Sequence, residues 1–409
     1  LINNIDMSTL TDATTINKLQ TKIFAGDLDG NGMEISGIRI VGTSSTGQKS
    51  DQIIADSSYG LFKQIGTYDN SAGGNGNAEL THIRNIKFSV DEISKSTSTF
   101  TGILAGVIIN TALKDVEINT QNLTVLGRNI TGGIAGAILG NSTLYNVSSN
   151  ANVTSAYVSL ENDEYQTNFE NKVSHFKNTL TNENHTNLDK TNNATSYAGG
   201  IAGVIDVKSQ IETNETYTNT SRRNSNVDMI TVKGDIAITG EIVGGISGYL
   251  GEDAYISNSQ FEVSTNDSQR LKGYFVAGGL IGENYGVINL CKVEVNYTNV
   301  NAYDKATNNN TGNNLFENED TNPVYIGGLV GVNYGGYITT SYSKTNVYHH
   351  NASFAGGLIG LATNNGKLPE NAKDKDDFKN YRPTILKEVY STGNVFAGAN
   401  GILSDSTTK

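Results

Sequence analysis

The sequence contains very little cysteine, proline or tryptophan: 1 Cys, 3 Pro and no Trp occur among its 409 residues. A single Cys excludes a disulfide framework and leaves the redox compartment unassigned. Scarce proline is typical of a fold in which most backbone N–H groups donate to neighbouring strands. No window approaches 18 consecutive apolar residues, so we expect no transmembrane helix in this chain.

Charge is also sparse, and it is mostly negative. Charged residues make up 17% of the chain, and 41 acidic against 29 basic side chains give a formal net charge of −12 at pH 7. The basic residues form no cluster, so the chain lacks the electrostatic footprint of a nucleic-acid-binding protein. We therefore expect no nucleic acid among its partners.

Glycine is in excess, together with Asn, Ser and Thr, which favour turns and strand surfaces and exclude a mostly helical protein. Many of the 45 glycines belong to a block of two glycines, two apolar or small residues and another glycine. The second glycines of successive blocks lie 29 to 67 residues apart, which indicates a repeat with insertions. The six clear blocks are Gly132–Gly136, Gly199–Gly203, Gly244–Gly248, Gly278–Gly282, Gly327–Gly331 and Gly356–Gly360, with weaker relatives at Gly60–Gly66 and Gly102–Gly106.

An alternating apolar pattern follows most of these blocks. From its first large apolar residue, positions +3, +5 and +7 are apolar or small, as in Leu113, Val116, Ile118 and Thr120. Steps of two predict a strand with one face turned inward, and the initial step of three predicts a corner where the strand bends. The same pattern starts at Leu144, Ile256, Ile288, Ile338 and Leu386.

These two patterns predict a solenoid. One repeat is too short to bury its own apolar face, but stacked repeats bury a continuous column, and the glycine block supplies a bend where successive coils approach closely. We predict an all-β fold, a right-handed parallel β-helix with loop insertions. It would span residues 1–409 as a single fragment of a longer protein, since the chain stops just past what looks like another repeat. About 10–14 coils spaced ~4.8 Å apart would give a rod of roughly 50–70 Å.

Four stretches rich in Asn, Thr, Lys, Asp and Glu interrupt the repeat. Insertions in a solenoid leave from turns, and binding often resides there, although a polar surface loop without a ligand is an equally simple interpretation. The insertions cover about residues 155–196, 206–226, 298–322 and 364–384.

Several segments resemble the GLUG-motif repeat proteins. Phe24–Gly32 with Ile35–Ile38 is similar to the opening coil of that family, and Leu1–Met7 to the strand that precedes it. Tyr390–Val395 resembles the family's strand ending, Ser341–Val347 is a looser copy, and the glycine blocks are similar to the motif core. The resemblance implies a β-helix segment of a large secreted bacterial surface protein, such as an adhesin, an autotransporter-like protein or the N-terminal region of an immunoglobulin-A-cleaving metallopeptidase. It implies no single activity.

Candidate metal sites are weak. Asp27–Gly32 begins like an EF-hand calcium loop, but position 12, which needs a bidentate Glu, is Ile38, so we interpret the segment as an Asx/Gly turn between coils. The five histidines form no His-Glu-x-x-His motif, so this stretch is not the catalytic part of a zinc peptidase. The pair His349 and His350 is interpreted as surface turn residues. We expect no metal and no cofactor.

Candidate catalytic groups are also weak. Cys291 takes the slot that Ser259 and Ser341 fill in sister repeats, which predicts a buried small side chain rather than a nucleophile. The acidic clusters within Glu161–Glu164 and Asp374–Asp377 lie in polar insertions, where solvated charge is the ordinary interpretation.

The acids borne by the coils are Glu117, Glu262 and Glu294, which are expected to point outward without evident partners. We expect no catalytic residue. A polysaccharide-active enzyme is nevertheless retained as an alternative, because a fold does not determine a function.

Tyrosine is the most suggestive surface residue. Tyr285, Tyr334 and Tyr337 follow glycine blocks, and Tyr342, Tyr348 and Tyr390 recur in strands. Tyrosine suits contacts with sugars or proteins, but recurrence at repeat positions favours a ladder that stabilises neighbouring coils. Asn214 is a candidate glycosylation site, because its sequon lies within a longer bacterial acceptor pattern with an upstream acid.

Taken together, the sequence favours a non-enzymatic structural and adhesive β-helical shaft of a secreted bacterial cell-surface protein that binds through its loops. The expected partners are host or neighbouring-cell glycans or proteins, or further copies of the chain; no ligand-binding residue is identified. One alternative is the non-catalytic β-helix domain of a large immunoglobulin-A-cleaving metallopeptidase. The other is a polysaccharide-active β-helix enzyme.

Overall fold

The structure is a computed structural model in which every element of the described residues is a β-strand. It describes residues 1–10, 20–41, 45–46, 57–67, 80–121, 123–155, 196–206, 226–234, 236–263, 271–295, 300–302, 325–349, 354–364 and 382–397.

The described strands form three long sheets, which we name A, B and C. Sheet A contains β1 (Ile5–Asp6), β3 (Asp27–Ile40), β7 (Thr81–Ile93), β10 (Thr111–Thr120), β14 (Thr143–Ser149), β18 (Asn226–Asp228), β19 (Thr231–Gly234), β22 (Tyr255–Ser257), β23 (Gln260–Val263), β26 (Val287–Asn289), β27 (Lys292–Val295), β31 (Tyr337–Thr339), β32 (Tyr342–Ser343), β36 (Ile385–Lys387) and β37 (Tyr390–Ser391).

Sheet B contains β2 (Ile23–Phe24), β6 (Phe62–Ile65), β9 (Ala105–Ile109), β13 (Ala135–Leu139), β17 (Ala202–Ile205), β21 (Ser247–Leu250), β25 (Ile281–Asn284), β30 (Val330–Tyr334) and β35 (Ile359–Thr363). Sheet C contains β4 (Ser45–Thr46), β5 (Ser57–Tyr59), β8 (Phe100–Thr101), β11 (Thr124–Leu126), β12 (Ile130–Gly132), β15 (Asn152–Thr154), β16 (Tyr197–Gly199), β20 (Ile238–Gly244), β24 (Leu271–Gly278), β28 (Val300–Ala302), β29 (Tyr325–Gly327), β33 (Val347–His349), β34 (Phe354–Gly356) and β38 (Val395–Ala397).

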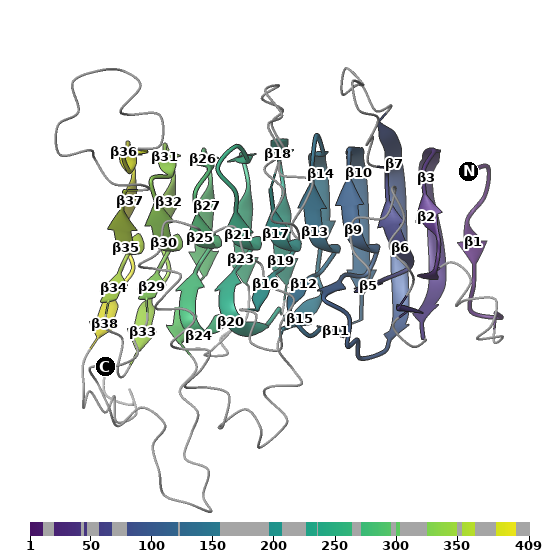
Figure 1. Ribbon diagram of the computed structural model, residues 1–409, viewed down its shortest axis with the longest axis horizontal. Coiled ribbons are helices and arrows are strands. Elements are labelled where there is room, and N and C mark those ends of the chain that lie inside the picture. The colour runs from purple at the N-terminus through teal and green to yellow at the C-terminus, as the bar shows by residue number, and fades with distance from the viewer. Residues whose placement is uncertain are drawn as a thin grey trace, which may run out of the picture.

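The chain visits these sheets in a fixed cycle. It passes from sheet A to sheet C, then to sheet B, and returns to sheet A one position further along the long axis, so the two ends of the chain lie at opposite ends of a rod (Figure 1). Described strands pair in parallel, apart from β4 and β5, which are antiparallel. The architecture is therefore all-β with long parallel sheets, consistent with a parallel β-helix.

The number of coils agrees with the lower end of the expected range of 10–14. In sheet A the described strands occupy ten successive positions along the rod, because β18 with β19, β22 with β23, β26 with β27, β31 with β32 and β36 with β37 each belong to one coil. Ten coils spaced ~4.8 Å apart span about 45 Å, slightly less than the 50–70 Å expected.

The glycine block forms the corner between sheets C and B, as predicted. In one coil Gly278 ends β24, and Ile281 begins β25 three residues later. A Cβ on Gly278 would lie well inside van der Waals contact with the carbonyl oxygen of Ile281 and the backbone N of Gly331 in the next coil. A Cβ on Gly279 would collide in the same way with the carbonyl oxygen of Gly328. The coils therefore approach too closely for any side chain at these two positions.

The predicted corner within each sheet A strand is also confirmed. Asp115, between the buried residues Leu113 and Val116, has a left-handed backbone with φ of 54°, and this residue turns the strand. Equivalent residues of the other coils have φ between 44° and 56° and form a column along the rod. The column consists of Asn31, Asn85, Asp115, Asn146, Met229, Asn258, Leu290, Thr340 and Glu388.

Two apolar cores run through the rod. The main core takes the inward side chains of all three sheets, such as Ile138 of β13 and Val243 of β20. The alternate side chains of sheets B and C, such as Leu139 and Ile242, form a second core where the outer faces of these sheets meet. The last glycine of each block permits this contact, because a Cβ on Gly282 would strike the side chain of Ile242.

Candidate functional site

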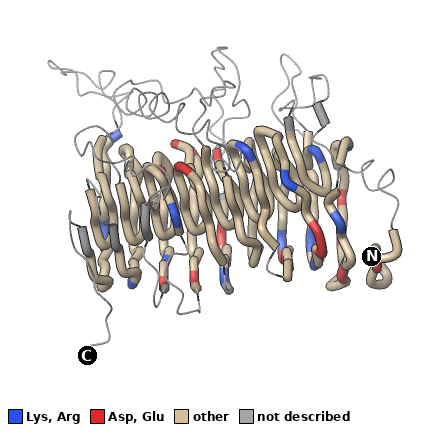
Figure 2. The backbone as a smooth tube through the Cα atoms, turned by 90° about the horizontal axis from the view of Figure 1, so that it is seen from below, with Lys and Arg blue, Asp and Glu red and all other residues tan. Residues whose placement is uncertain are grey.

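The outer face of sheet A carries charge pairs that connect neighbouring coils. Glu117 lies 3.7 Å from the amine of Lys87, and Glu262 lies 3.4 Å from that of Lys233. The sequence-based expectation that the coil-borne acids lack partners is therefore wrong, although their outward orientation is confirmed. The partners come from adjacent coils, so they are distant in sequence. Figure 2 shows acidic and basic residues distributed along the coils.

Glu294 has the densest set of partners on this face. Its Oε1 accepts a hydrogen bond from Tyr342 Oη at 2.6 Å and from Lys344 Nζ at 3.0 Å, and Lys292 lies 3.9 Å from its Oε2. The Tyr342 and Lys344 hydrogen bonds hold the pKa of Glu294 below its usual value. The same contact with Glu294 raises the pKa of Tyr342 to about 12. This arrangement ties two coils together and leaves Tyr342 a poor acid.

The predicted tyrosine ladder is present in two places. On sheet A, the rings of Tyr342 and Tyr390 stack with centroids 5.0 Å apart and planes 9° apart. In the second core, Tyr285 and Tyr334 stack with centroids 4.8 Å apart. Because stacked rings turn their faces toward one another, these faces are not available for a sugar, which favours the ladder interpretation. The side chain of Tyr348 lies outside the described residues.

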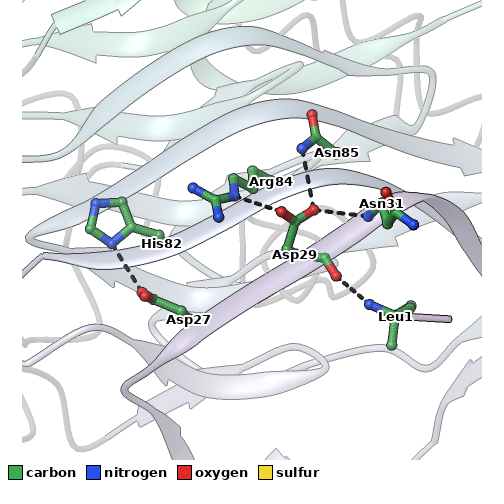
Figure 3. Close-up of polar contacts among 7 residues, drawn as sticks. All are labelled: Leu1, Asp27, Asp29, Asn31, His82, Arg84 and Asn85. Carbon is green, nitrogen blue, oxygen red and sulfur yellow. Dashed lines mark hydrogen bonds and ion pairs between the residues drawn. The ribbon is translucent and has the colours of Figure 1, made fainter.

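The acidic side chains of the calcium-like segment Asp27–Gly32 bind other groups of the protein. Asp29 accepts hydrogen bonds from the backbone N of Asn31 at 2.9 Å, from Asn85 Nδ2 at 3.2 Å and from Arg84 Nε at 2.9 Å (Figure 3). These bonds, with the Asn31 bond strongest, lower the pKa of Asp29 to about 2.

Asp27 lies 3.0 Å from His82 Nδ1, and the terminal amine of Leu1 donates to the carbonyl of Asp29 (Figure 3). The predicted Asx turn exists, but it lies at the corner within β3 rather than between coils. Across the described residues, no group of three or more His, Cys, Asp or Glu side chains is arranged to hold a metal.

Cys291 occupies the predicted buried slot. Its Sγ donates to the carbonyl of Asn289 at 3.2 Å, and its backbone N donates to Ser341 Oγ at 3.0 Å. Burial raises the pKa of the thiol to about 12. Because Cys291 is buried and the pKa of its thiol is raised, we interpret it as a residue that packs in the core.

Glu283 is a functional group that the sequence did not single out. It is 5% exposed in the second core, where Tyr197 Oη donates to its Oε2 at 3.4 Å. Burial raises the pKa of this carboxyl to about 8. The only signal in the sequence was a Glu beside the last glycine of a block, where sister blocks have Ala137, Val204 or Val332.

Two of the four proposed insertions interrupt sheet C. In each case the strand before the insertion and the strand after it pair with nearby residues of the same neighbouring strand. Thr154 pairs with Thr239 and Tyr197 pairs with Ile242, so the 42 residues between them bridge a step of three residues in β20. In the same way, Ala302 pairs with Gly273 and Tyr325 pairs with Val276 of β24. Both departures therefore lie at the same position of the coil.

The other two insertions leave from the corner between sheets B and A. Ile205 pairs with Leu250 of the next coil, and Asn226 pairs with Tyr255. In that next coil only four residues connect the two strands at this corner. Thr363 pairs with Tyr334 of the preceding coil, and Ile385 pairs with Tyr337. In that preceding coil only two residues lie between the paired positions. The coil resumes its register after each departure.

Some predicted site residues lie outside the part of the chain that the structure describes. They are Asn214, the acidic clusters within residues 161–164 and 374–377, His350, and nearly all of the insertions at 155–196, 206–226, 298–322 and 364–384.

Comparisons with known proteins identify no relative: no family model, no curated protein and no solved structure matches this chain. In the described residues, no helix is long and apolar enough to cross a membrane.

Proposed function

We propose that this chain is the structural and adhesive shaft of a secreted bacterial cell-surface protein, wound as a right-handed parallel β-helix that binds through its inserted loops. The main support is that the coils pair in parallel with their neighbours on both sides of every insertion. The pairs Thr154–Thr239 and Tyr197–Ile242 show how little the coil is displaced where 42 residues depart. A shaft of this kind carries variable loops without a change in its own packing. The right-handed winding follows from the strong preference of parallel crossovers for that hand.

The insertions leave the rod along two lines. Two insertions leave at the same place in sheet C and two at the B–A corner, so each pair lies along one line of the shaft. Loops on one line reach one extended partner, and several weak contacts then add through effective concentration. Glycans or proteins on a host or neighbouring cell are partners of this extended kind.

The test is a binding screen with loop deletions. The intact chain is applied to a glycan array and an array of extracellular host proteins, in parallel with variants in which residues 303–324 or residues 365–381 are replaced by two Gly residues. We expect the variants to keep the strand circular dichroism and melting temperature of the intact chain and to lose binding to at least one array member. Retained binding in both variants and in the matching deletions of 156–195 and 207–225 would refute adhesion through the loops. Protease shaving of intact cells of the source organism tests the surface location separately.

A further inference from the structure

Glu283 lies in a row of side chains that sheet B turns toward sheet C. The register of sheet B aligns this row. From β9 to β35 it consists of Val107, Ala137, Val204, Tyr249, Glu283, Val332 and Leu361, and in β6 the same position is the buried Gln64. A carboxylate is therefore placed where the neighbouring coils have an aromatic side chain, Tyr249, and an aliphatic one, Val332.

The surroundings of Glu283 are closed. Glycines allow sheet B to pack closely on sheet C here, because a Cβ on Gly282, in the same strand as Glu283, would strike Ile242, and one on Gly331 of the adjacent β30 would strike Val276. Glu283 is 5% exposed. Little room for water exists beside a group that normally needs water when it is charged.

The titratable groups that face Glu283 are tyrosines. Tyr197 of β16 donates to its Oε2, and Tyr249, Tyr285 and Tyr334 surround them, with Tyr197–Tyr249 centroids 5.8 Å apart and Tyr249–Tyr285 centroids 5.2 Å apart. Burial, and after it the charge on Glu283, raises the pKa values of Tyr197, Tyr285 and Tyr334, so these tyrosines supply no opposite charge, and the hydrogen bond from Tyr197 is their one contribution that favours the carboxylate.

Two acidic groups lie near Tyr249 of this row. Asp206 and Glu252 raise the pKa of Tyr249, after burial, and Glu252 is itself paired with Arg382 at 3.7 Å. Burial, the principal cause, raises the pKa of Glu283 to about 8, and the hydrogen bond from Tyr197 opposes this increase.

We propose that Glu283 is a proton-dependent latch that holds sheet B against sheet C in the middle of the rod. In its neutral form the carboxyl group fits the row of side chains on sheet B. In its charged form it draws water, and β25 separates locally from β16 and β20, which exposes the tyrosines of the second core. Low pH closes the latch, and high pH opens it.

The direction with pH follows from proton linkage. Between the ordinary pKa of Glu, near 4.5, and the folded value of about 8, the folded state holds a proton that the unfolded state has lost. The stabilisation is therefore complete below about pH 4.5 and is lost as the pH rises through 8. One such proton changes the unfolding equilibrium by up to about tenfold per pH unit in this window.

The test compares amide hydrogen exchange of the intact chain with Glu283→Gln at the same pH, so that intrinsic exchange rates cancel. Glu262→Gln is the matched control, because it makes the same substitution on the outer face of sheet A. At pH 5 we expect equal protection of residues 197–205 and 276–285 in all three proteins. At pH 8.5 we expect several-fold faster exchange of these segments in the intact chain and in Glu262→Gln, but not in Glu283→Gln. Equal exchange in all three proteins at pH 8.5 would overturn the latch.

A second variant keeps the test decisive if Glu283→Gln does not fold. Tyr197→Phe removes the hydrogen bond that favours the charged carboxylate and leaves the ring in place. The pKa of Glu283 then rises, so the opening transition should move to higher pH by a measurable fraction of a unit. An exchange profile with the same midpoint as the intact chain contradicts the assignment of the transition to Glu283.

Discussion

At the scale of single residues, a tight steric constraint recurs at the first glycine of each block. Gly278, Gly327 and Gly356 each face the carbonyl oxygen of the residue that starts the following sheet B strand, at distances where no Cβ fits. These glycines have ordinary negative φ values, since none is among the left-handed residues. The requirement is therefore steric and does not arise from backbone conformation.

Gly278→Ala should lower the free energy of unfolding by about 3 kcal/mol, the upper end of the overpacking range, because the obstacles are backbone atoms of its own coil and the next. Gly26→Ala is the matched control, since a Cβ there has nothing within 4 Å. Urea unfolding followed by circular dichroism measures both. Equal stability of the two variants would contradict the packing that we describe at this corner.

At the scale of the element, the column of residues with positive φ in sheet A contains residue types that differ in how readily they adopt this conformation. Asn and Asp tolerate this conformation, whereas Leu290 and Thr340 adopt it at a cost of about 1–2 kcal/mol each. The side chain of Leu290 is exposed, so it recovers little by packing. The corner is thus imposed by the buried residues on either side of it, such as Ile288 and Val293.

Leu290→Asn should raise the free energy of unfolding by about 1 kcal/mol, because Asn adopts a positive φ more readily. The reciprocal change, Asn258→Leu in the preceding coil, should lower it by at least as much, since it also removes the 3.1 Å hydrogen bond from Asn258 Nδ2 to Asp228 Oδ1. Chemical denaturation of both variants checks the pair. Changes of the same sign would show that backbone strain is not the controlling factor.

The polar ladder on sheet A gives a second prediction at this scale. Tyr342→Phe keeps the ring stack with Tyr390 but removes the 2.6 Å hydrogen bond to Glu294, so the pKa of Glu294 should rise toward its ordinary value. Glu294 contributes stability above its unfolded pKa and loses it as the pH falls through its depressed folded pKa. The variant should therefore lose about 1 kcal/mol at neutral pH and less at pH 3. Carboxyl NMR titration and melting curves at the two pH values measure these effects, and an unchanged Glu294 titration would contradict them.

How much could be predicted from the sequence depends on whether a feature repeats. The glycine corners and the strand positions of Val293 and Phe261 recur in every coil, so each copy supports the others. The partners of Glu294 could not be predicted, because Lys344 is 50 residues away and its position depends on how much chain the intervening insertion takes. The contact between Tyr197 and Glu283 spans 86 residues and was missed for the same reason.

At the scale of the whole molecule, the two ends of the rod differ. At the N-terminal end, β1 pairs with β3, and Asn4 and Leu1 hydrogen-bond the backbone of β3. At the other end, the last described coil exposes Phe354, Leu386 and Val395, although their register partners in the preceding coil, Tyr325, Ile338 and Val347, are buried. The apolar column therefore ends openly in β34–β38 among the described residues. Local unfolding of a solenoid begins at the coil that has only one neighbour.

This asymmetry predicts unequal effects of one substitution at two equivalent positions. Ile338 and Leu386 are register partners in adjacent coils, but Ile338 is 0% exposed and Leu386 is 45% exposed. Ile338→Ala should lower the free energy of unfolding by about 3–4 kcal/mol, because it leaves a cavity between two coils. Leu386→Ala should lower it by about 1 kcal/mol or less, because water already reaches that site. Urea unfolding measures both changes, and hydrogen exchange should show β36 and β37 opening before β31 and β32. Equal losses would mean that a further layer of protein covers Leu386 in solution.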